Sequence, residues 1–99
     1  MGRARLLVEL DVDPAKADEF VAMFREEFIA RSRGEDGCEQ YELWRDSENA
    51  AKMTIVEVWR DQAALDVHLA QDWFEVWAPR MAAAQATPLV VRKMVSVED

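Results

Sequence analysis

The order of hydrophobic patterns along the chain is the feature that most constrains its fold. Three segments alternate apolar and polar side chains with the period of two that is typical of β-strands: residues 3–12, 38–45 and 53–59. Two longer segments, 14–33 and 61–86, space their apolar side chains three and four positions apart, which predicts helices. The valine-rich segment 89–97 predicts a last strand. The predicted order is therefore strand, helix, strand, strand, helix, strand.

Capping and helix-breaking residues mark the ends of the predicted helices. Asp13 precedes Pro14, and this pair predicts a helix start, because Asp accepts a bond from a free N–H and proline needs none there. Asp61 is the expected cap of the second helix, and Asp72 is expected to cap a further turn. Pro79 is expected to kink or restart that helix, because proline removes a hydrogen bond from a helix interior.

This order predicts the ferredoxin-like α+β fold, in which both helices cover one face of a four-stranded antiparallel sheet. The strand at 53–59 is apolar on both sides, so we expect both sheet faces to be covered. An uncovered four-stranded apolar face would exceed what monomeric proteins normally expose. We therefore expect residues 1–99 to form one domain that pairs with a second copy as a homodimer.

Charge and residue usage narrow the possible partners. The chain has 12 basic and 20 acidic residues, a net charge of −8, which opposes binding to nucleic acid or to an anionic membrane. No segment approaches the roughly 20 apolar residues that span a bilayer. With one cysteine the chain forms no internal disulfide, so the cytoplasm is the expected location. One histidine and no glycine-rich phosphate loop lead us to expect no metal and no organic cofactor.

Three short motifs, in this order and spacing, carry a resemblance to a known family. They are residues 37–46 (GCEQYELWRD), residues 57–61 (EVWRD), and a following helix that carries His68 and the pair Trp73-Phe74. The chain resembles the antibiotic-biosynthesis monooxygenase family, with its quinol monooxygenase-like members, over about residues 5–97. The resemblance implies a dimeric α/β barrel with a pocket between each sheet and its helices. It also implies oxidation of a quinol or polyphenolic substrate by O2 with no cofactor.

Such a reaction requires a proton acceptor in a dry aromatic pocket with a polar group near the developing charge. His68 is the candidate catalytic base, since histidine has an unperturbed pKa of about 6.5; a packed histidine bonded to a backbone carbonyl is the alternative. Glu57 is the second catalytic candidate, because it lies in an apolar strand. It could accept a proton or orient His68, or it could form an ion pair with Arg5 or Arg92.

Aromatic residues are the candidates for substrate binding. Trp59, Trp73, Phe74 and Trp77 could form walls on which a flat ring stacks, and core packing is the alternative for each of them. A pocket role is favoured for Trp59, because it matches the tryptophan of the family's strand motif. Tyr41 could donate its hydroxyl group to a substrate oxygen or bond across the dimer.

Two other functions fit the same scaffold. An isomerase of a small keto-sugar would need Glu57 and His68 but no oxygen. A non-catalytic dimer would use the pocket only to bind a small hydrophobic molecule. A fold alone does not decide between such functions, because function depends on the site that the fold carries.

Overall fold

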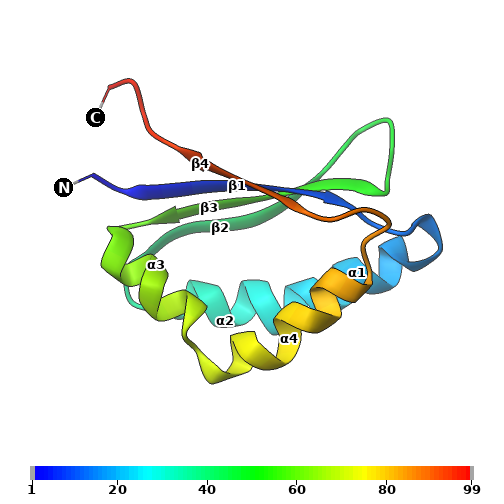
Figure 1. The fold of residues 1–99 in the computed structure, drawn as a ribbon, viewed down its shortest axis with the longest axis horizontal. Helices are drawn as coiled ribbons and strands as arrows, with labels where there is room; N and C mark the ends of the chain where they lie inside the picture. Colours follow the sequence, from blue (N-terminus) through cyan, green and yellow to red (C-terminus); the bar gives the residue numbers. More distant parts are fainter. Residues whose placement is uncertain (1, 99) are drawn as a thin grey trace.

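A computed structural model of the protein describes residues 2–98 and contains one four-stranded antiparallel sheet with helices on one face (Figure 1). The strands are β1 (Ala4–Asp11), β2 (Cys38–Arg45), β3 (Lys52–Trp59) and β4 (Val90–Met94). They lie in the order β2-β3-β1-β4, and every neighbouring pair is antiparallel. The ferredoxin-like fold is thereby confirmed. The last strand is shorter than the predicted segment 89–97, since only Val90–Met94 pair with β1.

The first predicted helix is a continuous helical run whose hydrogen-bonding pattern changes along its length. It consists of η1 (Pro14–Lys16), α1 (Ala17–Phe24), the π-helical segment η2 (Arg25–Ile29) and α2 (Ala30–Arg33). Asp13 caps it as predicted, since its Oδ1 accepts from the backbone N–H of Ala15 at 3.0 Å. The π-helical segment was not predicted; such segments are rare and often occur at functional sites. It contains Phe28, which reaches the cavity described below.

The second predicted helix is interrupted and forms α3 (Gln62–Leu69) and α4 (Asp72–Ala83). Asp61 caps α3 as predicted, because its Oδ1 accepts from the backbone N–H of Ala64 at 2.9 Å. The chain leaves the helix at Ala70 and enters α4 after Gln71, so two short helices replace one long one. No helix within residues 2–98 is long and apolar enough to cross a membrane.

Helix α4 differs from the sequence prediction at two positions. Its N-cap residue is Gln71, and Asp72 lies inside the first turn instead of capping it. The helix also runs through Pro79 and does not restart there. Proline leaves the carbonyl oxygen of Glu75, four residues earlier, without its helical partner. Both residues are exposed, so water can hydrate this carbonyl group and the helix continues.

Strand register determines which side chains face the helices. On β3 these are Met53, Ile55, Glu57 and Trp59, as the alternation predicts, and all four are buried. Their β1 neighbours on the same face are the buried residues Leu10, Val8 and Leu6. The helical run covers them with Phe20, Phe24 and Phe28, whose rings stack in series. The core therefore lies between the sheet and the helices, with one carboxyl group inside it.

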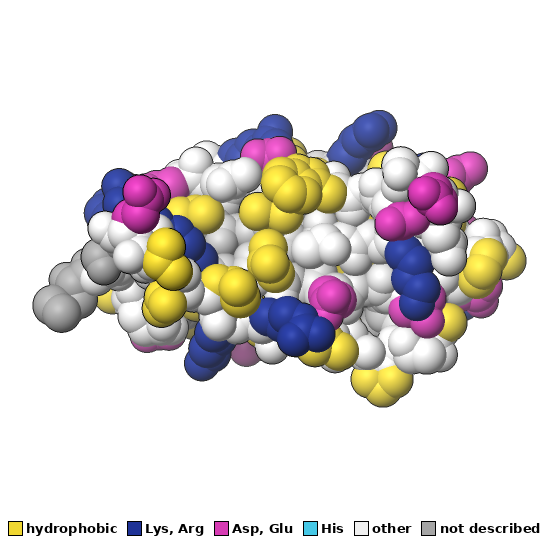
Figure 2. Space-filling model, turned by 90° about the horizontal axis from the view of Figure 1, so that it is seen from above, with side chains coloured by type: hydrophobic (Ala, Val, Ile, Leu, Met, Phe, Trp, Pro, Cys, Tyr) yellow, Lys and Arg dark blue, Asp and Glu magenta, His cyan; other side chains and the backbone are white. Residues whose placement is uncertain are grey.

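The opposite face of the sheet is not covered by any element within residues 2–98 (Figure 1). Figure 2 shows this face, with hydrophobic side chains across its middle and Lys, Arg, Asp and Glu between and around them. Trp44, Val90 and Met94 are 55%, 47% and 43% exposed. Arg92 and Glu9 form an ion pair at 2.7 Å across β4 and β1. The face is therefore mixed, where the sequence led us to expect an apolar one, because β1 and β4 place Arg5, Glu9 and Arg92 among the apolar side chains on it.

Candidate active site

A cavity of about 540 Å³ lies between the helix-facing side of the sheet and helices α3 and α4. Apolar side chains from β1, β3, β4 and both helices form most of its lining, and Tyr41, Glu57 and His68 are the buried polar ones. The exposed residues Gln62, Asp66 and Lys93 also line it and connect it to solvent. Its size and composition are typical of a small-molecule site.

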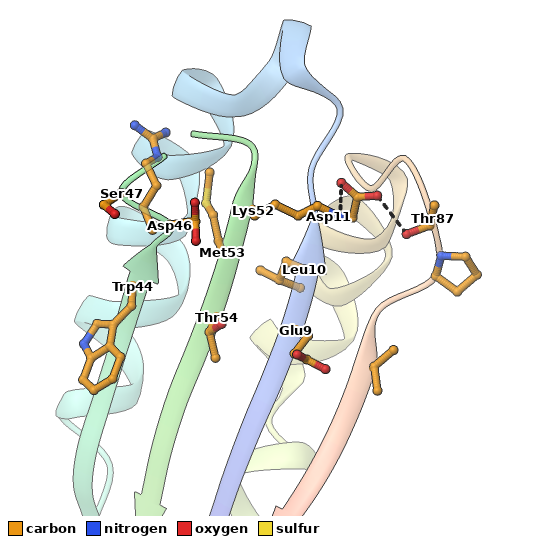
Figure 3. Close-up of a pocket in the computed structure, with 13 residues that line it drawn as sticks. Glu9, Leu10, Asp11, Trp44, Asp46, Ser47, Lys52, Met53, Thr54 and Thr87 are labelled. Carbon is orange, nitrogen blue, oxygen red and sulfur yellow. Dashed lines mark hydrogen bonds and ion pairs between the residues drawn. The ribbon is translucent and has the colours of Figure 1, made fainter. Parts of the chain in front are cut away.

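A larger hollow, of about 780 Å³, opens at the end of the sheet near the turn between β2 and β3 (Figure 3). Among the residues that line it is Asp11, whose carboxylate forms an ion pair with Lys52 at 3.3 Å and accepts from the hydroxyl of Thr87 at 3.2 Å. None of the candidate site residues lines this hollow. It contains no buried titratable group, so the cavity under α3 and α4 is the candidate active site.

His68 is held by a carboxylate that the sequence did not single out. The histidine is on α3 and is 1% exposed, and its Nδ1 lies 2.8 Å from Oε1 of Glu35. Glu35 lies in the loop between α2 and β2 and is 11% exposed. Its other oxygen, Oε2, accepts from the indole N–H of Trp73 at 3.2 Å. Glu35, His68 and Trp73 thus form a hydrogen-bonded group from three different segments.

Aromatic rings enclose the histidine. The nearest ring is that of Trp59, with centroids 4.5 Å apart, followed by Phe74 at 5.2 Å and by Tyr41 and Trp73 at 5.6 Å. This burial lowers the pKa of His68 below its ordinary value, while the hydrogen bond and the charge of Glu35 act in the opposite direction. The imidazole ring is therefore mainly neutral at pH 7 and can accept a proton.

Glu57 is a buried carboxyl group that forms no ion pair with any residue in the described range 2–98. It is 5% exposed, and its Oε1 accepts from the indole N–H of Trp59 at 3.0 Å. Burial raises its pKa to about 7; the hydrogen bond from Trp59 lowers it, and the charge of Glu35 raises it further. Arg5 pairs with Val58 and Arg92 pairs with Leu7, and all of these residues lie on the face of the sheet opposite to Glu57. Neither arginine therefore shares a face with Glu57.

Tyr41 completes the polar lining of the cavity. It lies on β2 directly opposite Glu57 in the strand register and is 2% exposed. Burial, and next the charge of Glu57, raise the pKa of Tyr41 well above its ordinary value. The phenol group therefore stays protonated and can only lose its proton at a high cost, so it is suited to donate a hydrogen bond.

The four aromatic residues predicted to line a substrate pocket lie in different parts of the structure. Phe74 lines the cavity, and Trp73 holds Glu35. Trp59 is fully buried behind His68, where it contacts the imidazole ring and Glu57 and does not line the cavity. Trp77 lines a separate groove between α1 and α4, with the guanidinium group of Arg80 4.5 Å from its ring centroid. Of the four, Trp59, Trp73 and Phe74 thus surround the histidine, and Phe74 also lines the cavity.

The site is equipped for proton transfer. His68 is a neutral base, Glu57 titrates near neutral pH, and Tyr41 is a hydrogen-bond donor, all within one largely apolar cavity. Within residues 2–98, no group of three or more His, Cys, Asp or Glu side chains is arranged to hold a metal ion.

Comparison with known proteins identifies the family. Residues 4–80 match the model of the antibiotic biosynthesis monooxygenase family, and the chain belongs to this family. The crystal structure of an antibiotic biosynthesis monooxygenase is 28% identical, with a TM-score of 0.87 over 95% of this chain and 98% of that chain. A conserved protein from Methanosarcina mazei Go1 is 26% identical, with a TM-score of 0.88 over 95% and 92% of the two chains.

A curated relative extends beyond the matched region. An uncharacterized protein of Synechocystis sp. is 32% identical over 83 residues, which are 84% of this chain and 56% of that protein. The chain thus spans a little over half the length of this relative.

Proposed function

We propose that the chain is a monooxygenase that oxidises a quinol or polyphenolic aromatic compound with O2 and needs no bound cofactor. The observation that carries this proposal is a neutral histidine, held by Glu35, in the wall of an apolar cavity of about 540 Å³. Membership of the antibiotic biosynthesis monooxygenase family supports the reaction class.

The reaction begins with the transfer of a phenolic proton from the substrate to His68. The resulting phenolate is electron-rich and passes one electron to O2, and the two radicals then combine at a ring carbon to form a peroxide. The peroxide O–O bond breaks: one oxygen atom stays on the ring as a carbonyl group, and the other leaves as water. The substrate thereby loses the four electrons that O2 gains. The proton on His68 and the proton of the oxidised ring carbon go to that water.

The side chains of the cavity have separate tasks in this scheme. The apolar lining keeps water away from the peroxide, which would otherwise decompose. Tyr41 and the protonated form of Glu57 can donate hydrogen bonds to the oxygen atoms on which negative charge develops. Phe74 offers an aromatic surface to the substrate ring.

Oxygen consumption by the metal-free protein with a panel of hydroquinones and naphthols tests the proposal. His68→Gln is expected to lower kcat by about 100-fold or more, the usual contribution of a general base. Trp77→Phe is the matched control, because Trp77 lies outside the cavity, and it is expected to keep full activity. Failure of every substrate to raise the rate above the blank, or full activity in His68→Gln, would contradict the proposal.

An isomerase is the second candidate, and one observation favours it. Glu57 and His68 line the same cavity, so one group can remove a proton from a carbon next to a carbonyl group while the other protonates the oxygen. Such a reaction consumes no oxygen. Turnover of a small keto-sugar under anaerobic conditions, together with no oxygen consumption on the phenol panel, would favour the isomerase over the monooxygenase.

We also propose that the open face of the sheet binds a second copy of the chain, so that two sheets face each other. Trp44, Val90 and Met94 are exposed apolar side chains on this face, and the same side chains of a second copy could cover them, which supports the proposed dimer. A four-stranded interface should bury on the order of 2,000 Å² in total. Sedimentation is expected to give twice the monomer mass, and Trp44→Glu is expected to shift the protein toward monomer. A folded wild-type monomer at micromolar concentration would refute the dimer.

A further inference from the structure

We propose that Glu35 is a positioning residue: it fixes the proton of His68 on Nδ1 and thereby directs the unprotonated Nε2 toward the cavity. The geometry that carries this inference does not depend on the reaction. Its catalytic consequence rests on the proposed function, in which His68 accepts the substrate proton.

Both oxygens of Glu35 are held. Oε1 lies 2.8 Å from Nδ1 of His68, and Oε2 accepts from Nε1 of Trp73 at 3.2 Å. A carboxylate has no proton to offer, so the ring nitrogen that faces it must be the donor. The neutral ring then carries its proton on Nδ1 and its lone pair on Nε2. No residue within 2–98 forms a hydrogen bond to Nε2, so this nitrogen remains available to a ligand.

The loop that carries Glu35 is fixed at the N-terminal end of α3. Its backbone is closed by bonds from the N–H of Glu35 to the carbonyl of Ser32 and from the N–H of Cys38 to the carbonyl of Glu35. Gly37 has a φ of +87°, and its carbonyl oxygen accepts from the backbone N–H of Arg60 at 2.7 Å. These bonds keep the loop rigid, so the carboxylate has a defined direction.

The close approach of Gly37 to helix α3 explains how the carboxylate of Glu35 reaches His68. A Cβ atom built on Gly37 would lie only 2.6 Å from Cβ of Ala64, so a side chain there would push the loop away from α3. Ala64 is one helical turn before His68, which places the loop beside the imidazole ring. The short distance between Glu35 and His68 thus depends on a glycine at position 37.

Other ionisable groups surround the ring and must be included in any titration. Glu57 approaches from β3 and Tyr41 from β2, while Asp66 and Lys93 lie at the exposed rim of the cavity. Of these groups, none forms a hydrogen bond or an ion pair with His68 in the described part of the chain. Glu35 is therefore the carboxylate whose removal should change the state of the ring most.

Nuclear magnetic resonance of the ¹⁵N-labelled imidazole gives the test, because the chain has one histidine and its signals need no assignment. In the wild-type protein we expect the neutral ring to carry its proton on Nδ1. In Glu35→Gln a single amide oxygen must serve both Nδ1 and Trp73, so we expect a smaller population with the proton on Nδ1. We also expect a lower pKa for His68, because the charge that raises it is gone.

Two further variants separate positioning from a general loss of structure. Asp18→Asn removes an exposed carboxylate that forms an ion pair with Arg45, and it is expected to leave the imidazole signals unchanged. Trp73→Phe removes the second bond of Glu35 but keeps its charge, so the proton is expected to stay on Nδ1. Glu35→Asp keeps the charge with a shorter side chain and is expected to restore part of the wild-type signal.

Activity adds a second measurement. Loss of the carboxylate that orients a histidine costs about 10–100-fold at metal sites and about 10⁴-fold in serine proteases, so we expect Glu35→Gln to lower kcat by about 10-fold or more and to change KM little. The acid limb of its pH profile should move to lower pH, because the base has a lower pKa. A wild-type ring protonated on Nε2, or a Glu35→Gln ring identical to the wild-type one, would overturn the positioning role. If no substrate is oxidised while the proton lies on Nδ1 as expected, the proposed function fails and the positioning role stands.

Discussion

Replacement of Glu57 by glutamine should make the protein more stable at alkaline pH. The carboxyl group is 5% exposed and has no cation beside it, and burial raises its pKa from 4.5 to about 7. The folded protein thus holds this proton at pH values at which the unfolded chain has released it. Stability therefore falls as pH rises from about 4.5 to about 7 and stays low above that range. The whole loss is about 3 kcal/mol, at roughly 1.36 kcal/mol per pH unit.

Urea denaturation at about pH 5 and about pH 8 measures this effect. Glutamine keeps the oxygen that accepts from Trp59 but carries no titratable proton, so it removes the penalty without removing that bond. Since the unfolded chain is already partly ionised at pH 5, the advantage of Glu57→Gln should grow by about 2.5 kcal/mol between these two pH values.

The comparison with the variant is needed because His68 acts in the opposite direction. Its pKa is lowered by folding, so it contributes stability that increases as pH rises toward its unfolded value of about 6.5. This contribution is common to both proteins and cancels in their difference. Protein concentration must be equal, since a dimer makes apparent stability depend on it. An advantage that is the same at both pH values would show that Glu57 is ionised in the folded protein and would refute the account of a dry cavity.

Two predictions concern the structural framework of the site. Gly37→Ala should lower the free energy of unfolding by on the order of 1–3 kcal/mol, because the residue has a φ of +87° and a Cβ would meet Ala64 at 2.6 Å. Thermal and urea unfolding measure this loss, and an unchanged midpoint would contradict it. Phe24→Ala should lower the same free energy by about 3–5 kcal/mol, because the ring is fully buried and stacks on Phe28 with centroids 4.8 Å apart. A urea midpoint within error of the wild type would mean that the core closes around the gap.

Local sequence signals were sufficient for the fold and for the faces of its strands. The alternation along β3 predicts that Glu57 points to the same side as its apolar neighbours, and the structure agrees. Asp61 is followed by a helix because its side chain accepts a backbone bond within that same turn. The π-helical segment Arg25–Ile29 was not predictable in this way, because no residue type specifies it. The break before α4 falls at Ala70 and Gln71, directly before Asp72, where the sequence predicts a new helical turn; only the identity of the cap residue differs.

The site was only partly visible in the sequence, because its groups come from separate segments. His68 and Glu57 attract attention as polar residues on otherwise apolar faces. Glu35 lies 33 positions from His68 in an irregular loop, and only the docking of Gly37 on α3 brings the two together. The one local sequence feature that could have pointed to Glu35 is its position two residues before a glycine, and this pattern is too common to be informative.

The tryptophans of α4 show a further limit of sequence patterns. Trp73, Phe74 and Trp77 are close in sequence and suggest one aromatic wall, but successive helical residues point about 100° apart. Phe74 shares its side of the helix with Ala78 and Met81, and these three line the cavity. Trp77 follows Trp73 by one turn and lies over the neighbouring groove. Which side of a helix faces a cavity depends on packing that short-range spacing does not record.

The carboxyl group of Glu57 has a use that its structural contacts do not explain. Within residues 2–98 it accepts a hydrogen bond from Trp59, which an amide oxygen could accept equally well, and it forms no ion pair there, so its burial costs stability above neutral pH. What the carboxyl group adds is a proton that exchanges near pH 7, in the cavity that His68 also lines. Burial lowers the pKa of His68 below its ordinary value of 6.5 and raises that of Glu57 to about 7, so Glu57 holds its proton more firmly than His68 does. Near neutral pH the neutral His68 can therefore accept a proton while the protonated Glu57 can donate one, and a reaction that first removes a phenolic proton and later supplies protons to a departing oxygen requires both.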